Sequence, residues 1–328
     1  MRITKDRPLT SVLAPILADL IAEKRGVGYH YIKEAEAYAR FDQFCAAVGH
    51  RSLTLPRELV DAWTAKQPHE TEANRQGRIS RMRVLGQYMQ RRGYLAWVYP
   101  SHRTGAPVPA YQPYIFSFAE LAALWRAVDA CETDVNSPYR SRVLPVLFRV
   151  LYGAGLRVAE ALALRQSDFD PLVGTLHVRT AKLDKERRIP LHPMLAARVT
   201  RYLDALVWLR PLGGPLFPNP HGEPYAVSTV YRYFRRFLWQ AGISHQGRGH
   251  GPRLHDLRHT FAVHCLRQWV LDGVDLTVAL PYLSTYMGHV GLKSTQGYLR
   301  LTADLYPTVV RTVEQRFGAI IPAGGAEE

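Results

Sequence analysis

Hydrophobic residues recur at helical spacing through the first hundred positions. Two of the stripes consist of Val12, Ile16, Leu17, Leu20 and Ile21, and of Tyr38, Phe41, Phe44 and Cys45. Pro56 interrupts the pattern before a helix predicted to begin near Arg57. A longer helix is predicted over 72–92, with the apolar stripe Ile79, Met82, Leu85 and Met89. We therefore expect residues 1–100 to form one helical domain.

A second mainly helical pattern begins at Phe116. The segment before it, residues 101–114, is rich in Pro and Gly and has no periodicity, which predicts an interdomain linker. Ser117 lies three residues before Glu120, the spacing of a helix capping box. The second domain is expected over 115–318, with a last amphipathic helix at 305–317 and a disordered tail at 319–328.

One interruption of the helical pattern indicates strands. Residues 175–179 and 187–191 are short β-prone runs around a polar turn, which predicts a hairpin. The expected fold is therefore mainly α with a small antiparallel sheet, in two domains.

The composition favours a polyanionic partner. The 328 residues carry a formal net charge of +14, and both predicted domains are positive. Such an excess is typical of nucleic-acid binding. Membrane insertion is not expected, because no apolar run is long enough to span a bilayer and the first ten residues lack a signal-peptide core. The three cysteines are too few and too far apart for a disulfide framework, which favours a cytoplasmic protein.

The predicted helix over 72–92 is strongly basic. No acidic residue follows Glu72 on it, whereas solvated helix faces normally mix the two signs. Contact with the DNA backbone is the preferred interpretation, and an ordinary solvated face is the alternative. The arginines selected as DNA contacts are Arg75, Arg78, Arg81 and Arg83.

The stretch His-Asp-Leu-Arg-His at 255–259 could belong to a metal site, a phosphate site or a plain helix face. His255 and His259 have the spacing of two helical metal ligands. However, Arg258 would place a fixed positive charge beside any cation and cannot ligate it. His255 and Arg258 lie three apart and so share a face, which fits a phosphate site. His259 is given a structural role.

Further candidates for phosphate chemistry lie at separate places along the chain. Arg157 follows a Gly-rich turn and precedes Glu160, while Lys182 and Lys185 fall in the predicted hairpin turn. His289 follows Gly288, and Tyr298 comes nine residues later. Each of these signals is weak alone.

Taken in order, these residues resemble the tyrosine recombinase (phage integrase) family, which includes lambda integrase, Cre and the Xer recombinases. The family signature is Gly-x-Arg-x-x-Glu, a hairpin lysine, His-x-x-Arg, Gly-His, and a tyrosine nine residues on. The matching residues here are Arg157, Glu160, Lys182, His255, Arg258, His289 and Tyr298. Lys182 lies between Ala181 and Leu183, where the family often has glycines, so Lys185 is the alternative lysine.

The resemblance implies attack of Tyr298 on a DNA phosphodiester, giving a 3′-phosphotyrosine link. Planar guanidinium groups suit bidentate binding of a phosphate, the role expected of Arg157 and Arg258. Lys182 would protonate the leaving 5′-oxygen and Glu160 would orient Arg157. His255 would exchange a proton and His289 would hydrogen-bond the phosphate. No cofactor is expected, neither a metal nor a nucleotide.

The resemblance also implies an N-terminal core-binding domain and a tetramer on double-stranded DNA that exchanges strands through a Holliday junction. The helix at 305–317 would then dock on a neighbouring protomer or pack on its own core. Accessory or partner recombinase proteins, a mobile genetic element and the bacterial nucleoid are the expected context. The alternatives are a DNA-relaxing enzyme of the type IB topoisomerase kind and a non-catalytic DNA-binding accessory protein.

Overall fold

The computed structural model describes residues 8–101, 112–179, 186–207, 213–246 and 251–289, together with 295 and 298. The chain divides into two compact units, residues 1–111 and 112–328. The predicted helix at 305–317 and the predicted tail at 319–328 lie outside the described residues, as does most of the predicted linker.

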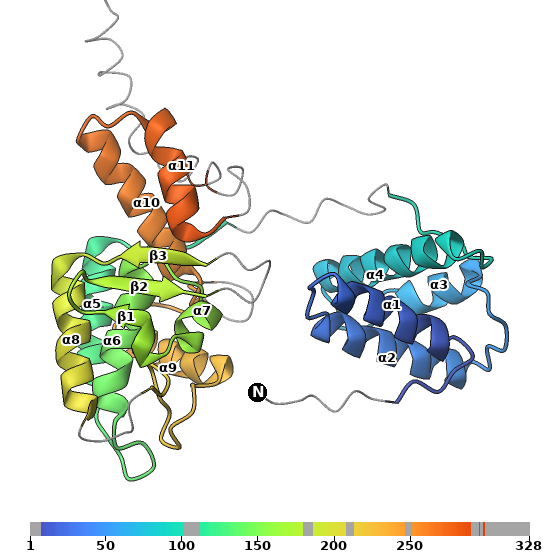
Figure 1. The fold of residues 1–328 in the computed structure, drawn as a ribbon, viewed down its shortest axis with the longest axis horizontal. Helices are drawn as coiled ribbons and strands as arrows, with labels where there is room; N and C mark the ends of the chain where they lie inside the picture. Colours follow the sequence, from blue (N-terminus) through green and yellow to red (C-terminus); the bar gives the residue numbers. More distant parts are fainter. Residues whose placement is uncertain are drawn as a thin grey trace, which may run out of the picture. The chain divides into compact units, whose positions relative to one another are not determined.

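The N-terminal unit contains four described helices, α1 (Ala14–Gly26), α2 (Ile32–Ala47), α3 (Arg57–Thr64) and α4 (Glu72–Arg91) (Figure 1). The apolar stripes read from the sequence face one another, and Leu17, Tyr38, Phe41 and Leu85 are fully buried in the common core. The Thr71 side chain accepts a hydrogen bond from the backbone N–H of Asn74 and so caps α4. The predicted start of α3 at Arg57 is confirmed.

The C-terminal unit is a group of helices beside a small sheet (Figure 1). Its helices are α5 (Phe118–Asp129), α6 (Arg140–Gly153), α7 (Val158–Ala163), α8 (Pro193–Val207), α9 (Val227–Gln240), α10 (Asp256–Leu271) and α11 (Leu276–Met287), with a short 3-10 turn at Gln166–Asp168. Helix α6 packs against α5, α8 and α10. The predicted capping box of Ser117 and Glu120 is present at the start of α5.

The sheet is antiparallel, with strands in the order β1 (Phe169–Asp170), β2 (Thr175–Val178) and β3 (Arg187–Pro190). In the predicted hairpin, Leu176 pairs with Ile189 and His177 with Arg188. Leu176 and Ile189 are fully buried against the helices. The prediction of a mainly α fold with a small antiparallel sheet is confirmed, and β1 is an additional strand that the sequence did not indicate.

Candidate active site

Glu160 lies at the centre of the candidate site. Helix α7 begins directly after Arg157, and the Glu160 carboxylate accepts hydrogen bonds from the Arg157 backbone N–H (2.9 Å) and from Nη1 of its side chain (2.6 Å). Gly155 in the preceding turn has a φ of +56°, and a Cβ there would lie 2.5 Å from the Phe261 ring. Glycine therefore lets this turn reach α10 and brings Arg157 beside it.

A second arginine, Arg187, binds the same carboxylate. Its Nη2 lies 2.9 Å from Oε2 of Glu160, and both side chains are at least 90% buried. Arg187 begins β3, two residues before the buried Ile189, so the alternation of the strand directs both side chains inward. That alternation could have identified Arg187 from the sequence, where it was treated only as part of the hairpin.

Arg258 is the third arginine, and it is buried to 99%. Its Nη1 donates to the Gly155 carbonyl (2.6 Å), and the guanidinium lies 3.9 Å from Oε2 of Glu160. Burial, together with the charge of Arg157, lowers the pKa of Arg258 to about 10. The alternative of a plain exposed helix face at 255–259 is therefore wrong, because the middle of this stretch is inside the protein.

The C-terminal end of α11 holds the three guanidinium groups in place. Arg187 Nε donates to the Tyr286 carbonyl (2.9 Å), Arg258 Nη2 to that of Met287 (2.6 Å) and Arg157 Nη2 to that of Gly288 (3.2 Å). The last carbonyls of a helix lack partners within the helix and carry partial negative charge, so cations are favourable there. This one helix end thus aligns arginines from three distant parts of the sequence.

Gly288 explains why the helix can end so close to these arginines. Its φ is +66°, and a Cβ there would lie 2.7 Å from Nη1 of Arg187. His289 follows immediately, and its Nδ1 hydrogen-bonds the Thr295 hydroxyl at 2.7 Å. Burial and the charges of Arg258 and Arg157 lower the pKa of His289 to about 4.

The Tyr298 hydroxyl is buried and hydrogen-bonded. Tyr298 is 5% exposed, and its Oη lies 3.0 Å from Nδ1 of His259. The Tyr298 ring lies 6.1 Å from the His289 ring. Burial raises the pKa of Tyr298, while the charges of Arg258 and Arg157 oppose this increase. His259, given only a structural role from the sequence, is therefore in direct contact with the candidate nucleophile, to which Arg258 also hydrogen-bonds.

His255 stands at the start of α10, directly before its first residue. Its ring is 4.7 Å from that of His259, and its pKa is lowered by burial and by the charges of Arg258 and Arg157. Among the predicted catalytic residues, the structure thus brings together Arg157, His255, Arg258, His289 and Tyr298. Lys182 and Lys185 lie outside the described residues.

The Glu160 carboxylate keeps its charge at neutral pH. Burial raises the pKa of Glu160, but hydrogen bonds from Arg187 and from the backbone of Arg157 outweigh burial and lower the pKa below its usual value. One carboxylate therefore faces three guanidinium groups, and the site retains excess positive charge. Such a site can bind and polarise a phosphodiester.

The arginines predicted to contact DNA from α4 make many bonds within the N-terminal unit. Arg78 binds the Glu70 carboxylate and the carbonyls of Trp63 and Ala65. Arg75 donates from Nε to the Thr64 carbonyl (3.0 Å), and Arg83 to the Tyr99 carbonyl (3.0 Å). The Nε atom of Arg81 is buried and has no hydrogen-bond partner among the described residues. The acids that pair with Arg78 and Arg75 are Glu70, before the helix, and Glu72, in its first turn. The absence of acids after Glu72 therefore did not indicate that these arginines are unpaired.

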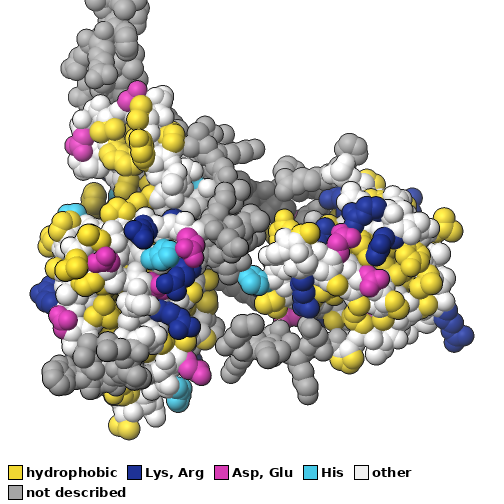
Figure 2. Space-filling model, in the orientation of Figure 1, with side chains coloured by type: hydrophobic (Ala, Val, Ile, Leu, Met, Phe, Trp, Pro, Cys, Tyr) yellow, Lys and Arg dark blue, Asp and Glu magenta, His cyan; other side chains and the backbone are white. Residues whose placement is uncertain are grey.

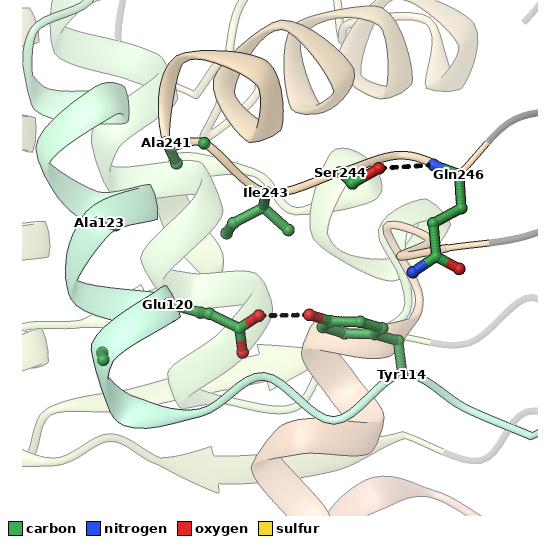
Figure 3. A pocket seen from close by; sticks show the side chains of 9 residues that line it. Tyr114, Glu120, Ala123, Ala241, Ile243, Ser244 and Gln246 are labelled. Atoms are coloured by element: carbon green, nitrogen blue, oxygen red, sulfur yellow. Dashed lines mark hydrogen bonds between the residues drawn. The ribbon is translucent and has the colours of Figure 1, made fainter.

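Other surface features do not belong to the site. Figure 2 shows Arg and His side chains, with Asp and Glu side chains among them, over the sheet of the C-terminal unit. A hollow of about 340 Å³ lies between α5 and the segment after α9, where the Tyr114 hydroxyl hydrogen-bonds Glu120 (Figure 3). It shares no residue with the cluster around Glu160.

The described residues contain neither a metal site nor a membrane-spanning helix. No group of three His, Cys, Asp or Glu side chains there could hold a metal ion. No described helix is long and apolar enough to cross a membrane.

The chain is similar to known proteins over most of its length. The family model described as the phage integrase family matches residues 120–304. A Sinorhizobium fredii protein named as an integrase/recombinase, y4rB, is 28% identical over 314 residues, covering 94% of this chain and 98% of its own length.

Two solved structures share the fold. XerH recombinase in a post-cleavage complex with its difH substrate has a TM-score of 0.63, with 19% identity, 92% of this chain and 83% of that chain covered. A lambda integrase tetramer on a Holliday junction has a TM-score of 0.56, with 18% identity and coverage of 88% and 80%.

The fold and the family match define a tyrosine-type strand-transfer enzyme. The family model covers more than half of the chain, from α5 to beyond Tyr298. The chain belongs to the phage integrase family, the tyrosine-type site-specific recombinases.

Proposed function

We propose that this protein cuts and rejoins double-stranded DNA at specific sites through a covalent 3′-phosphotyrosine link on Tyr298. The observation that carries the proposal is the position of Tyr298, a buried phenol in the same cluster as Arg157 and Arg258. A phenol with an ordinary pKa near 10 attacks phosphorus only when positive charge and a proton acceptor assist it. This cluster offers both.

In this proposal two of the guanidinium groups share one task. Arg157 and Arg258 bind the non-bridging oxygens of the phosphate as charge develops on them, and Glu160 holds Arg157 in position. His289 donates a hydrogen bond to the same phosphate. Lys182, or Lys185 in its place, protonates the leaving 5′-oxygen. His255 exchanges a proton with a reacting group, and the reaction uses no metal or nucleotide.

The N-terminal unit would hold the DNA, with Arg75, Arg78, Arg81 and Arg83 as the proposed contacts. The XerH and lambda integrase structures contain DNA, and the latter is a tetramer on a Holliday junction. We extend this assembly to the present chain, so that four copies would exchange two strands at a time. Accessory proteins and a mobile genetic element are part of the proposal.

The test uses nicked duplexes that tile the DNA on both sides of the gene. Each is incubated with the protein in chelator, and a denaturing gel is read for a protein–DNA band. Wild type should give a covalent band on at least one duplex, and Tyr298→Phe should give none. A band that persists with Tyr298→Phe contradicts the assignment of the nucleophile.

A second assay separates strand exchange from simple relaxation. Two copies of the cleaved duplex on one supercoiled plasmid should recombine. Relaxation of the plasmid without joining of the sites would favour the topoisomerase-like alternative, and an intact plasmid together with no covalent band would favour the accessory DNA-binding protein.

A further inference from the structure

The contact between Tyr298 and α10 involves His259. The histidine of the His-x-x-Arg motif, His255, lies one helical turn earlier. Tyr298 Oη is 3.0 Å from Nδ1 of His259, and the two rings are 5.4 Å apart. Because residues four apart share one side of a helix, the two histidines lie against each other, with His259 next to the phenol.

The position of His259 is fixed by the helix that carries it. Its backbone N–H donates to the His255 carbonyl within the first turn of α10. The neighbouring Arg258 is held by Gly155 and by the end of α11. The Nδ1 atom is therefore directed at Tyr298 by the same framework that positions the guanidinium groups.

We propose that His259 is a catalytic residue that accepts the proton of Tyr298 during strand cleavage. The proposal rests on the proposed function. The bond from Oη to phosphorus forms, and the bond from phosphorus to the 5′-oxygen breaks with its electron pair on that oxygen. The phenolic proton moves to Nδ1, giving an imidazolium, and the general acid assigned to Lys182 protonates the 5′-oxygen. Religation reverses each of these transfers.

The surroundings of His259 keep its ring neutral in the free protein. Burial and the neighbouring His255, Arg258 and His289 lower the pKa of His259 to about 4, so the ring is neutral at pH 7 and Nδ1 can accept. A phosphodiester bound by Arg157 and Arg258 brings a negative charge beside these positive groups. That charge favours the imidazolium at the stage when the phenol loses its proton.

The same helix carries a matched control. His264 Nδ1 lies 2.9 Å from the Tyr152 hydroxyl, and the ring is also partly buried. The pair is thus of the same kind as His259 and Tyr298, but it has no contact with Glu160 or its arginines. A histidine whose only task is to pack α10 should behave like His264.

The first arm of the test measures single-turnover cleavage of the nicked duplex that wild type cuts. An asparagine amide can occupy the place of Nδ1 and keep a hydrogen bond to Tyr298, but it cannot accept the proton. His259→Asn should therefore lower the cleavage rate by about 10²-fold or more, while His264→Asn remains within about threefold of wild type. Wild-type rates for His259→Asn would overturn the proposal.

The second arm separates the proton acceptor from the proton donor. A duplex with sulfur at the scissile 5′-bridging position needs no protonation of its leaving group. The cleavage rate of Lys182→Ala should be largely restored on this duplex. His259→Asn should stay defective, because the proton that His259 accepts comes from the attacking Tyr298 and not from the leaving group. Restoration of His259→Asn by the sulfur duplex would overturn the assignment.

The third arm needs no DNA and reads the contact itself. Nitrogen NMR of the histidine rings in the free protein should show the Nδ1 resonance of His259 shifting in Tyr298→Phe while that of His264 stays. Tyr152→Phe should give the reverse. An unchanged His259 resonance in Tyr298→Phe would refute the contact, whereas cleavage of no duplex by wild type would refute the proposed function, whatever the NMR result.

Discussion

Two groups of arginines in this protein differ in their spacing along the sequence and in the acceptors that they meet in the structure. The α4 arginines (Arg75, Arg78, Arg81 and Arg83) form the denser positive run, yet Arg78 meets a carboxylate and two carbonyls in its own unit. Arg157, Arg187 and Arg258 are scattered along the chain and converge on one carboxylate and one helix end. The positive charge left over at a group of arginines therefore depends on how many carboxylates and carbonyls lie near it. The density of arginines along the sequence does not give that number.

The largest effect should follow from exchanging Arg258 for lysine. The ammonium keeps the charge but cannot bond the carbonyls of Gly155 and Met287 and a phosphate together. The cleavage rate should fall by about 10²–10³, or about 3–4 kcal/mol, as measured by single-turnover formation of the covalent complex.

The matched exchange on α4, Arg78→Lys, should leave the cleavage rate of bound DNA almost unchanged. Equal losses in the two variants would mean that the two groups of arginines do not differ in the way that their contacts indicate.

Neutralising the shared carboxylate should destabilise the C-terminal unit. Glu160→Gln leaves three guanidinium groups around a neutral amide. The NH2 group of that amide would then face the N–H donors of the arginines, with which it cannot hydrogen-bond. The free energy of unfolding should fall by about 3 kcal/mol, measured by chemical denaturation. The exposed pair of Arg57 and Asp61 provides the control. Asp61→Asn should change the free energy of unfolding of the protein by less than about 0.5 kcal/mol. A stable Glu160→Gln variant would show that the cluster does not depend on its carboxylate.

On α4 the expected effect is on stability, with little effect on chemistry. Arg78→Ala removes hydrogen bonds that join α4 to the segment around Glu70, and should lower the free energy of unfolding of the N-terminal unit by about 2 kcal/mol. Arg91 lies on the same helix, paired with Glu23 at the surface and 58% exposed. Arg91→Ala should cost less than about 1 kcal/mol in the same denaturation experiment. Similar losses of unfolding free energy in both variants would show that the internal hydrogen bonds of Arg78 stabilise the unit no more than a surface ion pair does.

The sequence predicted those parts of the molecule in which neighbours along the chain are also neighbours in space. The hairpin, the start of α3 and the pairing of Arg157 with Glu160 all follow from local spacing. Strand β1 has two residues, too few for any periodicity to appear.

The contacts that the sequence missed join distant segments. Arg187 binds a carboxylate 27 positions away, and His259 contacts a phenol 39 positions away. Spacing along a helix or strand cannot encode such pairs, because tertiary packing brings β3 to α7 and Tyr298 to α10. The two residues nevertheless lie next to motif residues, so the alternation of β3 and the helical turn from His255 were usable signals.

The smallest expected effect is on how stability depends on pH, and it should differ between the candidate site and α4. The pKa values of His259 and His289 are about 4 in the folded protein, against an ordinary 6.5. Between pH 6.5 and 4 the unfolded chain therefore binds more protons, so the free energy of unfolding falls as the pH is lowered. The slope is at most about 1.4 kcal/mol per pH unit for each histidine, and less for these partly exposed rings.

Replacement of one of these histidines isolates its share of the acid response. His259→Asn should give a flatter dependence of unfolding free energy on pH than wild type between pH 6.5 and 4.5, by equilibrium denaturation at each pH. The pKa of Glu70, the partner of Arg78, lies below its usual value, so Arg78→Ala should lower stability by nearly the same amount at every pH well above that usual value. Parallel curves for wild type and His259→Asn would show that His259 is not held neutral by its surroundings, and that the excess charge around Glu160 does not extend to the residue that contacts Tyr298.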